Sequence, residues 1–258
     1  ESQGYYGDFA KEPYEALAKT LTGAFFHDGT YSSFRGSDWG APIDPARVPA
    51  WHFLGYLQTH DQVGNRALGE RIGHLLSDGL ARIGAALVLT SPFTPMLFMG
   101  EEWGASTPWQ YFTSHEEEEL ADAVRDGRRR EFAGHGWAAP DVPDPQDPGT
   151  VAASTLDWSE VSAQAHSSLL GWYRALIALR RAEPDLSDPR LDRTSLSYDA
   201  SAGWVVVIRG SLRVVCNLAA SAQEVPLDSP ITEVLLGSAP SSGVALPAES
   251  VLVARVAG

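Results

Sequence analysis

The residues of this sequence best suited to chemistry are a neighbouring imidazole and carboxylate, His60 and Asp61, in the string QTHDQVGNR. The Asp61 carboxylate offers two acceptor oxygens to sugar hydroxyl groups, and His60 can donate to a further hydroxyl. Gly64 lets the backbone approach a ligand closely, and Asn65 both donates and accepts hydrogen bonds. On spacing alone a structural role fits equally well, with Asp61 capping the following helix and His60 packed in a core.

The elements around this pair predict a strand–helix–strand unit. Trp51–Thr59 is a short apolar run that predicts a buried strand ending at His60–Asp61, and Thr94–Met99 predicts a second one. Between them a helix is expected to begin within Arg66–Arg71 and to continue through Leu75–Leu89, which is apolar at helical spacing. Such a unit places its two strands parallel, and in a barrel of parallel strands the catalytic groups gather where the strands end.

The rest of the chain divides by texture into two parts. Before residue 188 we expect a helix around Tyr14–Leu21, a loop over Asp28–Pro49, a loop-rich stretch over 103–158 and a helix over His166–Ala182. After it, β-branched runs separated by Gly, Pro and Ser predict a small antiparallel β domain; these runs are Trp204–Ile208, Leu212–Leu218, Ile231–Leu236 and Ser250–Val256. The predicted domains are therefore 1–187 and 188–258.

Composition excludes several classes of function. The net charge is −14, with 33 acidic and 19 basic residues, so a nucleic acid would be repelled, whereas a neutral sugar is indifferent to charge. Seven scattered histidines predict no metal site, no phosphate-binding loop occurs, and no cofactor is expected. Cys216, the only cysteine, lies in an apolar run that predicts a buried, inert thiol, which fits a cytoplasmic location. No apolar stretch predicts a membrane span, and Glu1–Gly7 is not expected to be a signal peptide, although a longer protein could carry one upstream.

Several strings together carry a family resemblance. HDQVGNR resembles the fourth signature of the α-amylase superfamily, which follows the seventh barrel strand, in the form typical of maltooligosyltrehalose trehalohydrolases. PMLFMGEEWG is similar to the eighth strand and the loop after it, and WQYFTSH to the segment that follows. VPDPQDPGTVAASTLDW and GYYGDF also resemble trehalohydrolase segments. These strings occupy Gly4–Phe9, His60–Arg66, Pro95–Gly104, Trp109–His115 and Val142–Trp158.

The resemblance implies an α/β fold, the last part of a (β/α)8 TIM barrel with strands seven and eight, followed by an all-β antiparallel sandwich. It implies a retaining hydrolase that cleaves the α-1,4-glucosidic bond next to the terminal trehalose of maltooligosyltrehalose. Asp61 then matches the carboxylate that stabilises the transition state. The implied partners are α-1,4-glucan oligosaccharides, and the implied substrate-binding residues are His60, Gln62, Val63, Gly64, Asn65 and, in the loop before strand seven, Phe34 and Arg35.

No residue of the chain matches the family's nucleophile or its acid/base, so the chain by itself is expected to be inactive. Arg190-Leu191-Asp192 spells the nucleophile signature but has no apolar strand before it, and Glu101 and Glu102 follow the eighth strand rather than the fifth. We expect a rim or structural role for both glutamates. Two alternatives stay open, another α-amylase relative such as a branching enzyme, and a glucan-binding piece without catalysis.

Overall fold

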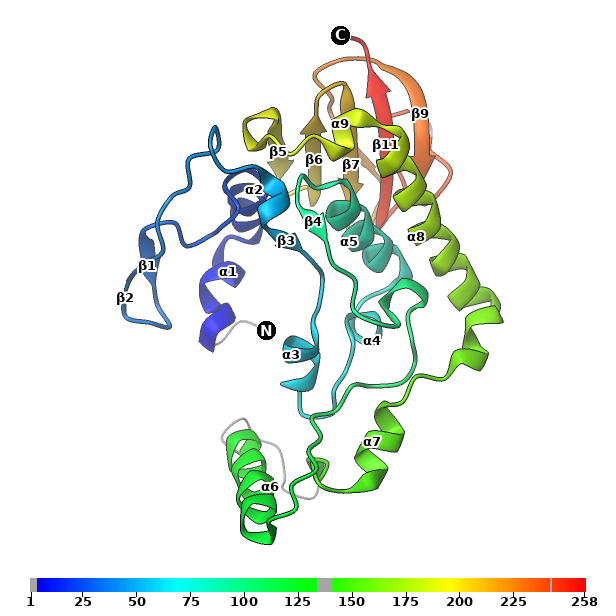
Figure 1. Ribbon diagram of the computed structural model, residues 1–258. Coiled ribbons are helices and arrows are strands. Elements are labelled where there is room, and N and C mark those ends of the chain that lie inside the picture. Colours follow the sequence, from blue (N-terminus) through cyan, green and yellow to red (C-terminus); the bar gives the residue numbers. More distant parts are fainter. Residues whose placement is uncertain (1–3, 134–140, 242) are drawn as a thin grey trace. The chain divides into compact units, whose positions relative to one another are not determined.

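The computed structural model describes residues 4–133, 141–241 and 243–258 (Figure 1). The chain divides into two compact units, each built from segments that are distant in sequence. The first unit comprises Glu1–Gly55, Arg82–Met96 and Trp172–Gly258, and the second comprises Tyr56–Ala81 and Leu97–Gly171. The predicted domain boundary between residues 187 and 188 follows the change in secondary structure instead and stays a prediction. Within the described residues, no helix is both long and apolar enough to cross a membrane.

The carboxyl-terminal sheet has five antiparallel strands in the order β5-β6-β7-β11-β9 (Figure 1). The four predicted β-branched runs are confirmed as β6 (Trp204–Arg209), β7 (Leu212–Asn217), β9 (Ile231–Gly237) and β11 (Ser250–Val256). The edge strand β5 (Thr194–Asp199) was not predicted, because only Leu196 and Tyr198 among its six residues are large and apolar.

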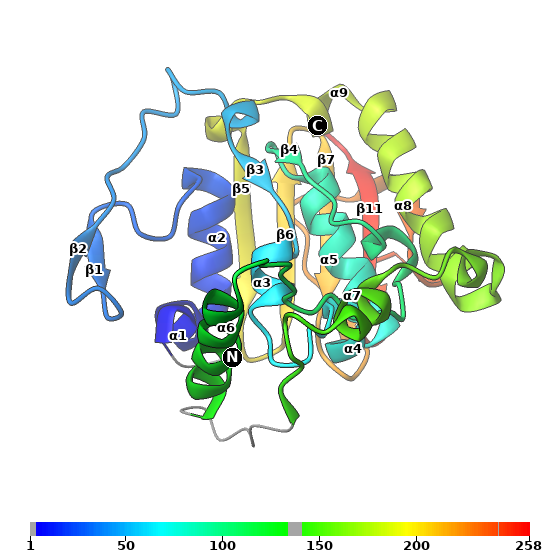
Figure 2. The same cartoon turned by 60° about the horizontal axis from the view of Figure 1, so that its bottom comes forward.

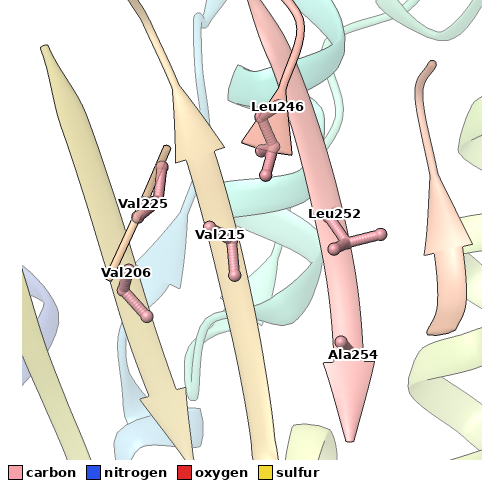
Figure 3. Packing of buried hydrophobic residues seen from close by; sticks show 6 residues of the cluster. All are labelled: Val206, Val215, Val225, Leu246, Leu252 and Ala254. Carbon is pink, nitrogen blue, oxygen red and sulfur yellow. The ribbon is translucent and has the colours of Figure 1, made fainter. Parts of the chain in front are cut away.

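Six apolar side chains form the core against this sheet (Figure 3). Four come from three strands of the sheet, Leu246 comes from β10 (Ala245–Leu246), and Val225 directly follows β8 (Gln223–Glu224), which pairs with β10 in a separate antiparallel ladder. Each fully buried Val or Leu contributes roughly 1.5–3 kcal/mol relative to an exposed one. The cluster joins two β layers, which confirms the antiparallel sandwich; its members are Val206, Val215, Val225, Leu246, Leu252 and Ala254.

Cys216 lies on β7, facing no solvent. Burial raises the pKa of its thiol to about 12, so the sulfur stays protonated and unreactive at neutral pH. The predicted inert thiol is confirmed.

The strand–helix–strand unit is present. β3 (Leu54–Gly55) and β4 (Thr94–Pro95) pair in parallel, and α5 (Asp78–Thr90) lies between them in the sequence. In both views α5 runs beside α8 (Gln164–Ala182), which confirms the helix predicted over His166–Ala182 (Figures 1 and 2). The Trp172 indole donates to the Arg82 carbonyl at 3.0 Å, and Arg180 donates to the Leu89 carbonyl at 2.9 Å. These bonds hold α8 against α5. Arg180 also donates to the Phe93 carbonyl, directly before β4.

The two predicted buried strands are wrong in length and burial. Strands were predicted over Trp51–Thr59 and Thr94–Met99, but β3 and β4 have two residues each. The 3-10 helix η2 (Ala50–His52) takes up the start of the first segment. Among the described strands, β3 pairs with β4 alone. Without a second neighbour, Trp51 and Leu54 are more than half exposed.

The helix expected to begin within Arg66–Arg71 is also wrong. The chain forms a short helix earlier, α3 (His60–Gly64), then turns and forms α4 (Ile72–Leu75) before α5. Gly69 causes the turn, since its φ of 68° is in the left-handed region and its carbonyl accepts from the Trp109 N–H at 2.8 Å.

Other elements complete the fold. The predicted first helix is confirmed as α2 (Pro13–Gly23), after η1 (Gly4–Tyr6) and α1 (Gly7–Lys11). The predicted loop over Asp28–Pro49 contains a small hairpin, and the predicted loop-rich stretch over 103–158 contains a 16-residue helix, α6. These and the remaining elements are β1 (Thr30–Ser32), β2 (Ser37–Trp39), η3 (Glu101–Trp103), α6 (Glu118–Ala133), α7 (Pro148–Ser154), η5 (Trp158–Ser162), α9 (Pro184–Ser187) and η6 (Leu191–Arg193).

Two identical substitutions test the sandwich core. Val215→Ala removes two methyl groups from a position with 0% exposure and should lower the unfolding free energy by about 2–3 kcal/mol. Val234→Ala removes the same groups from a side chain that is 53% exposed on β9 and should cost less than about 1 kcal/mol. Urea unfolding of both variants measures the difference, and equal losses would contradict the placement of Val215.

Candidate functional site

The short helix α3 presents the His–Asp pair. Thr59 is its N-cap, and the Thr59 N–H donates to the Gln62 side-chain oxygen at 2.7 Å. Within α3, Val63 and Gly64 are buried, whereas His60 and Asp61 are exposed on the first turn. The cap position is taken by Thr59, which argues against the reading of Asp61 as a helix cap.

The pair itself is open to solvent. His60 Nε2 lies 3.3 Å from Asp61 Oδ1, and the two side chains are 70% and 78% exposed. His60 is therefore not a packed core residue. An exposed pair of this kind contributes at most about 1 kcal/mol to stability. The exposed carboxylate of Asp61 and imidazole of His60 are available to bind a ligand.

The other predicted contacts in the motif are less accessible. Val63 and Gly64 are buried, and the Gln62 oxygen is engaged at the start of α3, whereas Asn65 is exposed. Gln62, Val63 and Gly64 therefore stabilise α3, through the capping hydrogen bond and through burial. Their contact with substrate stays a prediction.

The segment after α3 is fixed to the loop that follows β4. Arg71, only 2% exposed, donates to the Met99 carbonyl at 2.7 Å and to the Thr107 carbonyl at 2.6 Å. Burial lowers the pKa of Arg71, and the negative charges of Glu101, Glu102 and Glu160 act against this shift. Glu101 is buried in η3, which favours the structural role predicted for these glutamates.

Aromatic side chains pack around the same loop. Trp103 is 2% exposed and lies against Trp158, with ring centroids 4.8 Å apart. Its indole donates to Glu160 at 3.1 Å, and Glu160 also accepts from the Ser106 N–H at 2.9 Å. Trp103 therefore packs inside the second unit. Trp158 is 67% exposed on the outer side of this stack.

Phe34 and Arg35 form the turn of the β1–β2 hairpin. Phe34 is 58% exposed and meets the edge of Tyr5 at 5.8 Å between centroids. The guanidinium carbon of Arg35 lies 3.8 Å from the centroid of the Trp39 ring, in a cation–π contact. Both residues belong to the first unit, whereas α3 belongs to the second. The structure thus groups the predicted residues within each unit.

Asp8 anchors this turn. Its carboxylate accepts from the Ser33 N–H at 2.7 Å and lies 3.5 Å from His27 Nε2. The hydrogen bonds from Ser33 hold the pKa of Asp8 below its usual range. Sequence reasoning did not single out Asp8 or Trp39. The GYYGDF string contains Asp8, and its carboxylate was the signal that a closer reading of that string would have found.

The string Arg190-Leu191-Asp192, which spells the nucleophile signature, makes local structural contacts. Arg190 pairs with Asp188 through two nitrogens, and Leu191 is 1% exposed in η6. Among the described residues, no group of three or more His, Cys, Asp or Glu side chains could hold a metal ion.

The chain is similar in sequence to known proteins. A family described as a domain of unknown function (DUF3459) matches residues 189–253. The malto-oligosyltrehalose trehalohydrolase of Mycobacterium tuberculosis is 52% identical over 227 residues, which cover 88% of this chain and 39% of that protein. The chain is a relative of the malto-oligosyltrehalose trehalohydrolases. The resemblance inferred from HDQVGNR and its companion strings is confirmed.

Further matches agree. The trehalohydrolase of Brevibacterium helvolum is 50% identical over 238 residues, covering 92% of this chain and 40% of that protein. The crystal structure of a putative α-amylase from Salmonella typhimurium matches 100% of this chain with a TM-score of 0.88 and 34% identity, over 44% of that structure. This supports the expected fold class, a barrel part followed by a sandwich. The chain spans about two-fifths of the length of the trehalohydrolases that it matches.

A pair of glycine substitutions tests the turn that follows α3. Gly69 and Gly36 have φ values of 68° and 67°, so alanine at either position pays a similar backbone cost of about 1 kcal/mol. A Cβ at Gly69 would lie 2.4 Å from the Trp109 carbonyl carbon, but at Gly36 it would meet nothing within 4 Å. Gly69→Ala should therefore destabilise the protein by at least about 1–3 kcal/mol more than Gly36→Ala. Thermal unfolding of both variants measures this, and equal melting shifts would show that the turn yields freely.

Proposed function

We propose that the protein to which this chain belongs is a retaining glycoside hydrolase that acts on maltooligosyltrehalose. It cleaves the α-1,4-glucosidic bond next to the terminal trehalose and releases trehalose. The observation that carries the proposal is the exposed Asp61 carboxylate on the first turn of α3. Asp61 belongs to the string HDQVGNR, which resembles a trehalohydrolase motif. The names and identities of the relatives support the choice of substrate.

Asp61 acts on the sugar ring rather than as nucleophile. In a retaining mechanism the transition state resembles an oxocarbenium ion, and contacts with the ring hydroxyls strengthen as it forms. The Asp61 oxygens accept from two hydroxyls while their negative charge favours the developing positive charge. His60, 3.3 Å away, donates to a neighbouring hydroxyl. The nucleophile and the acid/base match no residue of this chain, so no step is assigned to them here.

Phe34 and Arg35 have a second role in the proposal. An exposed ring can stack on a glucose unit, and a guanidinium held over the Trp39 ring can direct its fork of donors at hydroxyl groups. The substrate is a neutral oligosaccharide, for which the net charge of −14 sets no barrier. The lone buried Cys216 supports a reducing compartment such as the cytoplasm.

The proposal predicts that Asp61→Asn impairs catalysis far more than folding. The substitution keeps size and removes charge, so in the full-length protein kcat on maltooligosyltrehalose should fall on the order of a hundredfold to a thousandfold, or about 3–4 kcal/mol. The melting temperature should stay close to that of the wild type, because the carboxylate is exposed and does not cap α3.

Asp126→Asn is the matched control, since Asp126 is also an exposed aspartate of the same unit. It should leave kcat unchanged. An Asp61→Asn enzyme that retains more than about a third of wild-type kcat would exclude transition-state stabilisation by this residue.

A second prediction separates catalysis from binding. Residues 1–258 by themselves should release no trehalose from maltooligosyltrehalose, because they hold only one carboxylate with a catalytic match. Trehalose assayed against a blank, with the full-length protein as the positive control, measures this. Glucan affinity without turnover by the full-length protein would instead support the glucan-binding alternative. Branching of amylose by it would support the other enzyme class.

A further inference from the structure

Arg128 is a buried cation on a helix that sequence analysis left as loop. It lies in α6 (Glu118–Ala133) and is 8% exposed, whereas Arg130 on the same helix is exposed. Arg125, one turn earlier, is paired with Asp144 and Asp122. Arg128 therefore differs from its neighbours in pointing its charge inward.

The guanidinium reaches the end of α3. Arg128 Nη2 donates to the Gly64 carbonyl at 2.5 Å and to the Arg66 carbonyl at 3.1 Å. Its guanidinium carbon lies 4.9 Å from the Tyr111 ring centroid and 4.7 Å from that of Phe132. Two aromatic faces thus hold the planar group while its donors meet two backbone acceptors.

This contact falls where α3 most needs one. A helix of five residues is marginal by itself, and its last carbonyl groups have no partner within the helix. Gly64 is the last residue of α3. A cation at that end satisfies the carbonyl and also complements the negative end of the helix dipole. Burial lowers the pKa of Arg128, and Glu131 and Tyr111 oppose that shift, so the group stays charged at neutral pH.

We propose that Arg128 is a positioning residue for Asp61, which it orients by clamping the carboxyl end of α3. The proposal rests on the function proposed above for Asp61. Asp61 has no buried contact of its own, since its side chain is 78% exposed. Its position therefore follows the backbone of α3. The Thr59–Gln62 bond fixes one end of that backbone, and Arg128 fixes the other.

Arg128→Met in the full-length protein tests the clamp. Methionine keeps an apolar stem between the two rings and removes every donor. We expect kcat to fall about tenfold or more, because small misplacements of a catalytic group are costly. Arg128→Lys keeps the charge and a donor and should recover part of that loss. Arg130→Met, an exposed position on the same helix, should leave kcat unchanged.

A double-mutant cycle distinguishes positioning from general damage. If Arg128 acts through Asp61, Arg128→Met should change kcat less than about twofold in the Asp61→Asn background, where the charge to be placed is already gone. A loss of the same factor in both backgrounds would overturn the proposal. So would a kcat unchanged by Arg128→Met.

Hydrogen exchange supplies a readout that does not depend on activity. Backbone amides of residues 60–69 should exchange about tenfold faster in Arg128→Met than in Arg130→Met, whereas amides of the β6–β7 hairpin should not change. Unchanged exchange over 60–69 would overturn the clamp even in an active enzyme. A wild-type protein that releases no trehalose would overturn the proposed function alone, and exchange would then decide whether Arg128 holds α3.

Discussion

The constraint on which most of this structure depends is the pairing of carbonyl groups that become buried where helices and strands end. Such groups lie outside the regular ladders and cost free energy if they lose water without gaining a donor. In this chain arginine side chains meet the need. Arg180 joins three carbonyls at the α5–β4 turn, Arg71 joins two in the loop after β4, and Arg209 joins two before the sandwich; the acceptors are Leu89, Ser91, Phe93, Met99, Thr107, Leu186 and Asp188. Arg128 does the same for Gly64 and Arg66.

Arginine suits this task because its planar fork carries several donors in fixed directions and keeps its charge when buried. The cost appears in the direction of the pKa shifts. Burial lowers the pKa of Arg71, Arg128 and Arg180, and it lowers that of Arg209 to about 10. Replacing one of these residues with an apolar one would remove the desolvation cost but would leave two or three carbonyls unpaired, which is the larger loss.

In the proposed function, the same kind of contact holds the backbone that carries Asp61 while its side chain stays exposed. α3 buries Val63 and Gly64 and shows His60 and Asp61 to solvent. If Asp61 binds sugar hydroxyls as proposed, its side chain has to stay exposed, and contacts of the α3 backbone have to fix its position. Fixing that backbone before substrate arrives reduces the reorganisation needed at the transition state. The Phe34–Arg35 turn follows a related plan, in which Asp8 holds the Ser33 N–H and Trp39 holds the guanidinium.

The sequence by itself determined features that rest on local pattern: the β-branched strands of the sandwich, the helices α2, α5 and α8, and the family, through HDQVGNR. It could not determine burial or boundaries in the barrel part, because the exposure of Trp51 and Leu54 depends on which strands lie beside β3. It also missed α6, a highly charged helix with few apolar residues. Only the tertiary structure decided that Thr59 rather than Asp61 caps α3, and that Arg128 meets Gly64 across 64 positions of sequence. A contact between residues so distant in the chain leaves no periodic trace, since the fold that brings them together is set by the packing of all the segments between them.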